Sequence, residues 1–194
     1  MKLILASKSP RRIEMLKNLG LSPEIMPAEV DENIDEFKGI PDIAVTTLAK
    51  RKAHAISQTA EGDSLIIAAD TLVYMGNTLL GKPKDENEAY VMLKALSGNH
   101  HSVYTGFAAY YNGKLISRCV ETKVLFKELS DGEIESYIAS KEPMDKAGAY
   151  GIQGKGALFV KGIDGDYFNV VGLPLCALFE AIKDEFGIDI EDMR

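Results

Sequence analysis

The chain has 194 residues, which is long enough for one sizeable core or for two lobes that share a sheet. Its 46% hydrophobic and 26% charged residues are typical of a folded globular protein and argue against disorder. The net charge of -7 argues against general nucleic-acid or membrane binding, because such proteins usually carry a basic excess. No run has the length of a transmembrane helix or a signal peptide, and the two cysteines lack CxxC spacing, so we expect a reduced, cytoplasmic protein.

Apolar patterns predict strands and helices that alternate along the chain. Residues 3–6 are a short apolar run typical of a buried strand, and the spacing after Pro10 predicts a helix that ends before Gly20. The unbroken apolar run over residues 65–69 predicts a central strand with Asp70 at its carboxyl end. The other predicted elements are an extended segment over 23–30, a helix over 42–58, a hairpin over 72–80, a helix over 85–96, long strands over 101–111 and 114–126, a helix over 130–140, a strand over 157–161 and a helix over 174–186.

The order of these elements predicts an α/β fold with a mixed, twisted sheet flanked by helices. There is no internal repeat, low-complexity segment or linker, so residues 1–194 are predicted to form a single domain. No GxGxxG follows a predicted strand, and neither GxxxxGKS nor GxxxxGKT occurs. The sequence therefore argues against a dinucleotide-binding Rossmann motif and a P-loop.

The first turn of the helix after Pro10 carries two adjacent cations, Arg11 and Arg12. Cations are disfavoured there because the N-terminus of a helix has partial positive charge. Free backbone N–H groups and guanidinium forks together suit an anion, so we interpret this turn as a candidate phosphate site. The plainer alternative is a pair of solvated surface arginines.

Five further residues are candidates for chemistry, each with a plainer alternative. Asp70 suits a general base or metal ligand, unless it merely caps a turn. Glu32 could hold a hard cation such as Mg²⁺, but solvated loop acids are more common. Lys52 and Lys82 could bind phosphate. The plainer alternatives are a solvated helix face for Lys52 and a structural turn for Lys82. Gln153 lies among glycines and could read a nucleobase edge, which is a weak signal by itself.

Taken together, these segments resemble the Maf family over nearly the whole chain. The resemblance rests on the order and spacing of short motifs, each of which would be weak alone. The motifs are ASKSPRR at 6–12, Asp31-Glu32, LAKRKA at 48–53, AADT at 68–71, GKP at 81–83, LSG at 96–98, Thr105-Gly106, EPMDKAGAYGIQG at 142–154 and GLPL at 172–175.

The resemblance implies a nucleoside triphosphate pyrophosphatase that needs a divalent cation, Mg²⁺ or Mn²⁺. It also implies a fold similar to that of the inosine triphosphate pyrophosphatases, with two lobes and a deep cleft, and it allows a homodimer. Asp70, Glu32 and Lys52 fall on catalytic positions, with Asp70 as the proton acceptor and Asp70 and Glu32 as metal ligands. The positions that bind substrate are Ser7, Arg12, Lys52 and Lys82 for phosphate and Arg11, Thr71 and Gln153 for the base.

The motifs SPRR, ADT and YGIQG resemble the branch of the family that acts on dTTP and UTP. We therefore expect these substrates, and modified pyrimidine triphosphates fit the same pattern. Two alternatives stay open at this point. Maf proteins are also named as septum formation inhibitors, so the chain could regulate cell division by binding, or it could be a broader house-cleaning enzyme for damaged purine triphosphates.

Overall fold

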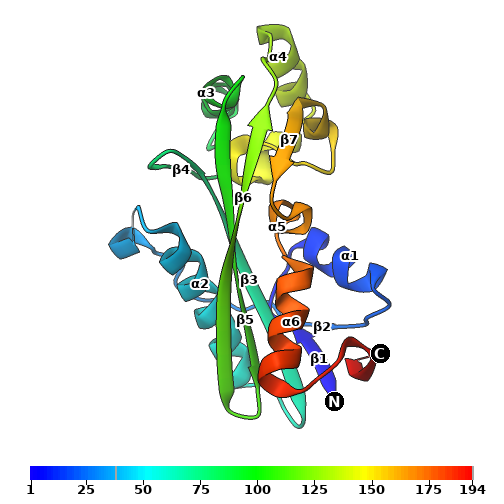
Figure 1. Ribbon diagram of the computed structural model, residues 1–194. Coiled ribbons are helices and arrows are strands. Elements are labelled where there is room, and N and C mark those ends of the chain that lie inside the picture. Colours follow the sequence, from blue (N-terminus) through cyan, green and yellow to red (C-terminus); the bar gives the residue numbers. More distant parts are fainter. Residues whose placement is uncertain (38, 194) are drawn as a thin grey trace. The chain divides into compact units, whose positions relative to one another are not determined.

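The computed structural model describes residues 1–37 and 39–193. The chain divides into two compact units: the first comprises Met1–Asp70, Thr105–Val120 and Gly172–Arg194, and the second comprises Thr71–Tyr104 and Glu121–Val171. Among the described residues, a seven-stranded sheet has the order β2-β1-β3-β5-β6-β7, with β4 paired to β3 (Figure 1). The predicted α/β fold with a mixed sheet flanked by helices is confirmed.

The predicted helices and hairpins are present, most of them to within one or two residues. Asn112 and Gly113 form the turn between β5 and β6 with φ of 46° and 81°, as a two-residue turn with positive φ at both positions requires. The strands are β1 Lys2–Leu5, β2 Glu24–Ile25, β3 Ser64–Met75, β4 Thr78–Leu80, β5 His100–Tyr111, β6 Lys114–Phe126 and β7 Val160–Asp164. The α-helices are α1 Pro10–Asn18, α2 Pro41–Ser57, α3 Glu86–Leu96, α4 Asp131–Ala139, α5 Tyr167–Val171 and α6 Leu175–Phe186.

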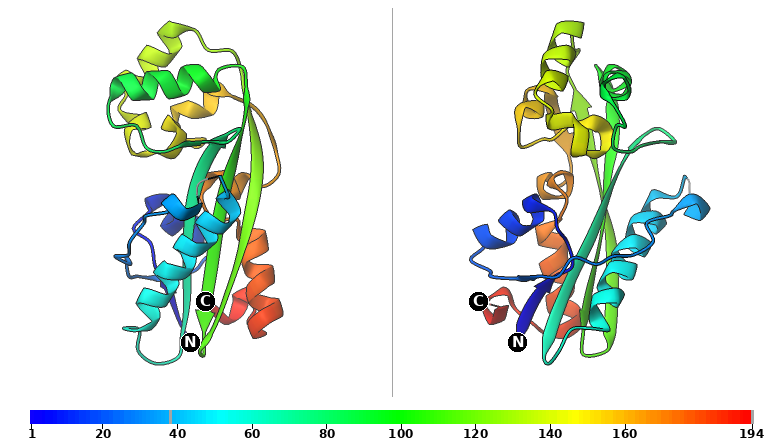
Figure 2. Two further views of the ribbon diagram at one scale, coloured as in Figure 1. Left: turned by 90° about the vertical axis from the view of Figure 1, so that its left-hand side faces the viewer. Right: turned by 180° about the vertical axis from the view of Figure 1, so that it is seen from behind.

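In the first unit, helices cover both faces of the strands. β1 pairs in parallel with both β2 and β3. α2 packs on one face, and α1 and α6 lie on the other, as the two opposite views in Figures 1 and 2 show. Ile4 of β1 and Ile66 of β3 share a buried cluster with Ala49 and Ala53 of α2, so small helix residues let α2 pack closely on the sheet.

One detail of β3 differs from the prediction and bears on the site. Asp70 was predicted to end this strand, but β3 continues to Met75, so Asp70 lies within it. The parallel pairing of β1 with β3 ends at Leu5 and Ile67, and Asp70 follows just beyond it. Because side chains alternate along a strand, Asp70 points to the same face as Ile66, which is the face that α2 covers.

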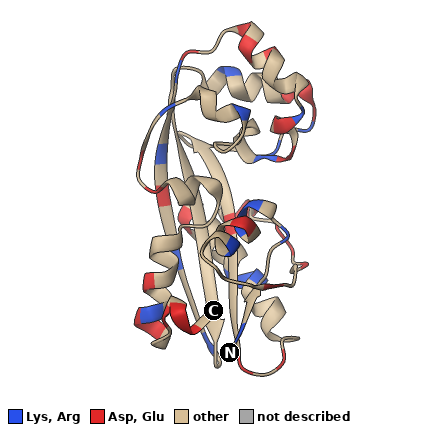
Figure 3. Cartoon of the chain, turned by 90° about the vertical axis from the view of Figure 1, so that its right-hand side faces the viewer, with Lys and Arg blue, Asp and Glu red and all other residues tan. Residues whose placement is uncertain are grey.

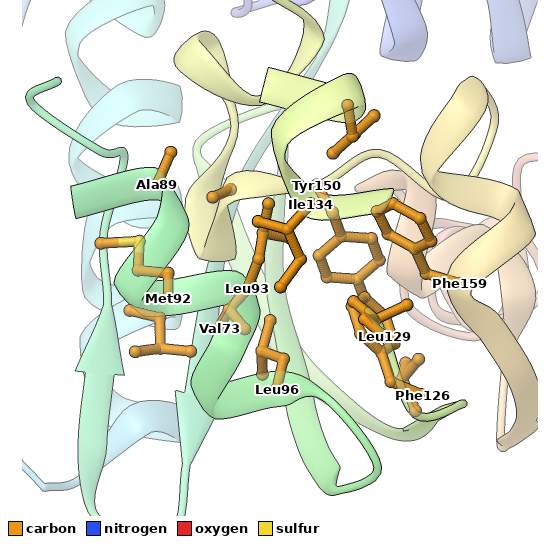
Figure 4. Close-up of a cluster of buried hydrophobic side chains, with 14 of the residues drawn as sticks. Val73, Ala89, Met92, Leu93, Leu96, Phe126, Leu129, Ile134, Tyr150 and Phe159 are labelled. Carbon is orange, nitrogen blue, oxygen red and sulfur yellow. The ribbon is translucent and has the colours of Figure 1, made fainter. Parts of the chain in front are cut away.

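The second unit has its own core between helices and strands. Figure 4 shows side chains from α3, α4, β3 and β6 gathered in one apolar cluster that includes Leu93, Ile134 and Phe126. The N-terminus of α4 carries a capping box, in which Ser130 and Glu133 satisfy each other's backbone N–H groups. Aromatic edges meet in this core, with Phe126 and Tyr150 ring centroids 4.7 Å apart.

Three local predictions are wrong. Only Glu24–Ile25 of the segment 23–30 forms a strand, because prolines flank this pair and Pro27 cannot donate to a ladder. The strand predicted over 157–161 is instead a 3₁₀ helix over Lys155–Phe159, and β7 begins at Val160. The short helix α5 was not predicted, because five residues are too few for a helical pattern to stand out.

Candidate active site

Charge is spread along the chain rather than gathered by sign, and blue and red segments are interleaved in Figure 3. Sites for anions must therefore be built locally, from particular cations. Two groups of charged and polar side chains lie in the first unit, near the end of the parallel pairing between β1 and β3.

The first group is an ammonium between two carboxylates. Lys52 Nζ of α2 lies 2.5 Å from Asp70 Oδ1 and 2.8 Å from Glu32 Oε1. The side chains of Lys52 and Asp70 are only 12% and 16% exposed, whereas that of Glu32 is 66% exposed. We call these three residues the Lys52 cluster. Lys52 on α2 and Asp70 on β3 are largely shielded from water, which strengthens the attraction between their charges. The carboxylate of Glu32 is exposed to solvent.

Lys52 reaches Asp70 because of the geometry of α2. Lys50 is exposed, while Lys52 lies next to the buried Ala49 and Ala53 that pack on the sheet. Lys52, with 12% of its side chain exposed, is therefore less exposed than its charged neighbours Lys50 and Arg51.

Arg51 has a role that the sequence did not suggest. Arg51 precedes Lys52 on α2, and its Nη1 donates to the carbonyls of Asp31 at 3.1 Å and Asn33 at 2.9 Å. These bonds fasten the loop that carries Glu32 to the helix that carries Lys52. No residue type marks these two bonds in the sequence, because both acceptors are backbone carbonyls.

The second group is centred on Arg12 and is called the Arg12 cluster. Arg12 Nε donates to Gly172 O at 2.7 Å, and Nη1 donates to Ala69 O at 2.7 Å and to Ser7 Oγ at 3.4 Å. Ser7 Oγ also accepts a bond from Ser9 N at 3.2 Å. Both bonds use the Ser7 oxygen as acceptor, so its hydroxyl hydrogen is left to donate.

Arg12 is thus not the solvated surface arginine of the plainer interpretation. Burial lowers the pKa of its guanidinium, and the charge of Arg11 adds to this effect, while Asp70 and Glu32 oppose it. The electrostatic interaction with Asp70 links the Arg12 cluster to the Lys52 cluster. Ser9 is the N-cap residue of α1 but makes no side-chain capping bond, and the first turn holds no acidic residue.

The first unit therefore brings together five of the predicted residues. The other predicted site residues, one in this unit and three in the second unit, belong to neither cluster. Arg11 is half-buried on α1. Thr71 is the half-buried residue after Asp70 on β3, Lys82 is exposed after β4, and Gln153 is exposed in the loop before the 3₁₀ helix Lys155–Phe159.

The carboxylates fit a hard cation held partly by substrate. Within residues 1–37 and 39–193, no three His, Cys, Asp or Glu side chains gather as a metal site. Asp70 and Glu32, however, both lie within 2.8 Å of one ammonium, so their oxygens converge on a single cationic position. Mg²⁺ is commonly bound through one or two carboxylates together with substrate phosphates, and this donor set suits that mode.

The profile of the Maf-like protein family matches residues 2–185. The chain belongs to this family, as its motifs indicated.

Relatives of the chain carry the name dTTP/UTP pyrophosphatase. The protein of that name from Alkaliphilus oremlandii is 51% identical over 191 residues, covering 97% of this chain and 98% of its own length. Proteins with the same name from Clostridium perfringens and Bacillus cereus are 47% and 48% identical, again over at least 95% of both chains.

A solved structure titled nucleoside-triphosphatase / dITP/XTP pyrophosphatase, from Mycobacterium abscessus, is also similar. It is 17% identical with a TM-score of 0.39, and the match covers 65% of this chain and 73% of that one. This likeness is too slight to support an argument. In the part of the chain that the structure describes, no helix has both the length and the apolar character needed to cross a membrane.

Proposed function

We propose that this protein hydrolyses dTTP and UTP to the monophosphate and pyrophosphate, with modified pyrimidine triphosphates as further candidate substrates. The names and near full-length similarity of its relatives support this proposal. The observation that carries it is the contact of Lys52 with Asp70 and Glu32, together with the half-buried guanidinium of Arg12, which interacts electrostatically with Asp70.

Asp70 is the proposed general base. Its carboxylate would accept a proton from water as the water oxygen attacks the α-phosphorus, and pyrophosphate would leave as the bond to the bridging oxygen breaks. Lys52 holds the Asp70 carboxylate in place through an ion pair that is shielded from solvent.

Hydrolysis of a phosphoanhydride depends mainly on positioning and on neutralising charge. Ser7 and Arg12 suit the phosphates through a hydroxyl donor and a half-buried cation, and we assign the ammonium of Lys82 to phosphate binding as well. Asp70 and Glu32 would hold Mg²⁺ or Mn²⁺, which when bound would neutralise phosphate charge and polarise the reacting phosphoryl group.

We assign base selection to Arg11, Thr71 and Gln153. The amide of Gln153 can donate and accept at once, which matches the adjacent N–H and carbonyl on the edge of thymine or uracil. Its exposed position leaves this amide accessible to a ligand.

Asp70→Asn tests the proposal directly. The amide keeps the shape of the side chain but accepts a proton very poorly, so kcat for dTTP should fall by about 10²- to 10⁴-fold. Asp184→Asn is the matched control, because the Asp184 side chain is 68% exposed and its ion pair with Arg118, at 3.9 Å, is a weak surface contact. The kcat of this control should equal that of the wild type. An unchanged kcat in Asp70→Asn would remove Asp70 from the mechanism.

A further inference from the structure

The loop that carries Gln153 is held at its far end by the carboxylate of Glu142. Glu142, in the 3₁₀ helix Glu142–Asp145, accepts hydrogen bonds from Lys155 N at 2.9 Å through Oε2 and from Gly156 N at 3.3 Å through Oε1. It also accepts a bond from the Tyr137 hydroxyl at 2.9 Å. These bonds lie entirely within the second unit.

Tyr137 extends this attachment to the start of the loop. Its hydroxyl accepts a bond from Gly151 N at 3.1 Å while it donates to Glu142 Oε1. Backbone on both sides of Gln153 is therefore held by the same pair of side chains. We call Glu142 and Tyr137 the loop anchor.

The glycines of the loop are needed for this close approach. A Cβ at Gly154 would lie 2.5 Å from Glu142 Cδ and 2.6 Å from its Oε2, too close for any carbon. A Cβ at Gly156 would lie 2.7 Å from Gly151 O and 2.8 Å from the Tyr137 hydroxyl. Backbone can therefore pack directly against the carboxylate only because these positions lack side chains.

Glu142 is ionised under ordinary conditions. Burial disfavours its charge, but the hydrogen bonds from Lys155 N, Gly156 N and Tyr137, with the nearby charge of Lys146, outweigh this and lower the pKa of Glu142. An ionised carboxylate only accepts hydrogen bonds, which matches the donors that surround it.

We propose that Glu142 is a positioning residue that sets nucleobase selectivity by holding the backbone of residues 151–156. Gln153 itself is exposed, so packing does not fix its side chain. A recognition amide discriminates between bases only when its backbone is pre-organised, and the loop anchor supplies that order. This inference rests on the proposed role of Gln153 in reading the base.

The test compares Glu142→Gln with Glu135→Gln, an exposed glutamate of α4 that serves as the matched control. In Glu142→Gln, an NH₂ group replaces one of the two carboxylate oxygens. Because this group cannot accept a hydrogen bond, the bond from Lys155 N or the bond from Gly156 N is lost. Tyr137→Phe removes the hydroxyl that reaches Gly151. Backbone amide hydrogen exchange over 151–156 and binding of non-hydrolysable dTTP and dGTP analogues are measured for each variant.

We expect Glu142→Gln to speed exchange in this loop and to reduce the ratio of dTTP-analogue to dGTP-analogue affinity by about 10- to 100-fold. Where turnover is measured, the loss should be mainly in KM for dTTP rather than in kcat. Tyr137→Phe should give a smaller change in the same direction, and Glu135→Gln none.

Unchanged exchange, or unchanged discrimination despite faster exchange, would overturn the proposal. The binding measurement separates this outcome from failure of the proposed function. Selective binding by a wild-type protein that hydrolyses no triphosphate would refute the hydrolysis and leave the role of Glu142 to be judged by binding and exchange. A wild type that does not prefer the dTTP analogue would overturn both.

Discussion

Gly106→Ala should damage both stability and activity, because this glycine lies under the helix that carries Lys52. A Cβ at position 106 would lie 2.5 Å from Val45 O and 2.6 Å from Thr46 N, where ordinary contacts are 3.4–4 Å. Both are backbone atoms of α2, so no side chain can rotate away. α2 must move off β5 by about 1 Å to make room for one methyl group.

The expected magnitude follows from that displacement. Overpacking of this kind costs about 1–3 kcal/mol of unfolding free energy. Lys52 Nζ now lies 2.5 Å from Asp70 Oδ1, and a shift of about 1 Å in the helix would misplace it. Misplacement of a catalytic group by that distance can reduce the rate about 100-fold.

The assay pairs urea unfolding, followed by circular dichroism, with steady-state pyrophosphate release from dTTP. Gly132→Ala in α4 is the matched control, because a Cβ there meets nothing within 4 Å and its φ is not positive. The control should be neutral or gain up to about 1 kcal/mol from helix propensity. The reasoning is refuted if Gly106→Ala keeps the unfolding midpoint and kcat of the wild type.

Three more predictions follow from the same contacts. Lys52→Met removes the ammonium between Asp70 and Glu32, so kcat for dTTP should fall by about 10²- to 10³-fold, and an unchanged kcat would contradict the role given to Lys52. Arg12→Lys keeps the charge but loses the fork that bonds two carbonyls, so urea unfolding should show a loss of about 1–3 kcal/mol, and equal midpoints would count against those bonds. Burial lowers the pKa of His101 to about 4, so the native state binds fewer protons than the unfolded state between pH 4 and 6.5. The contribution of neutral His101 to the free energy of unfolding is complete above about pH 6.5 and is lost as the pH falls to about 4. This loss should lower the free energy of unfolding by about 3 kcal/mol. A plot of unfolding free energy against pH should therefore be flatter between pH 4 and 6.5 for His101→Gln than for the wild type.

Much of the fold follows from local signals in the sequence. The turn at Asn112-Gly113, the capping box at Ser130 and the helical spacing of α2 each depend on residues that are close along the chain, and the hairpin and helices predicted there are confirmed. The strand β2 and the 3₁₀ helix Lys155–Phe159 depend on distant partners or on loop packing, and these were mispredicted. Short elements bury too few residues for their own pattern to decide their conformation.

The candidate site could be predicted as a set of residues but not as a geometry. Arg12 was selected because two cations stand at a helix N-terminus, yet its bond to Gly172 O spans 160 residues of sequence. Lys52 was assigned to phosphate, and its contact with both carboxylates emerges only when α2 packs on β3. Arg51 was overlooked because two of its partners are the backbone carbonyls of Asp31 and Asn33, which no residue type marks in the sequence.

Pyrophosphate release from a panel of nucleoside triphosphates tests the central claim most directly. The panel should contain dTTP, UTP, dCTP, dGTP and dATP, each with Mg²⁺, with Mn²⁺ and with a chelator. The proposed chemistry predicts release from dTTP and UTP that depends on the cation, with little from purines. Release that is insensitive to the chelator, or equal for purines and pyrimidines, would contradict it, and no release from any triphosphate would refute hydrolysis as the function.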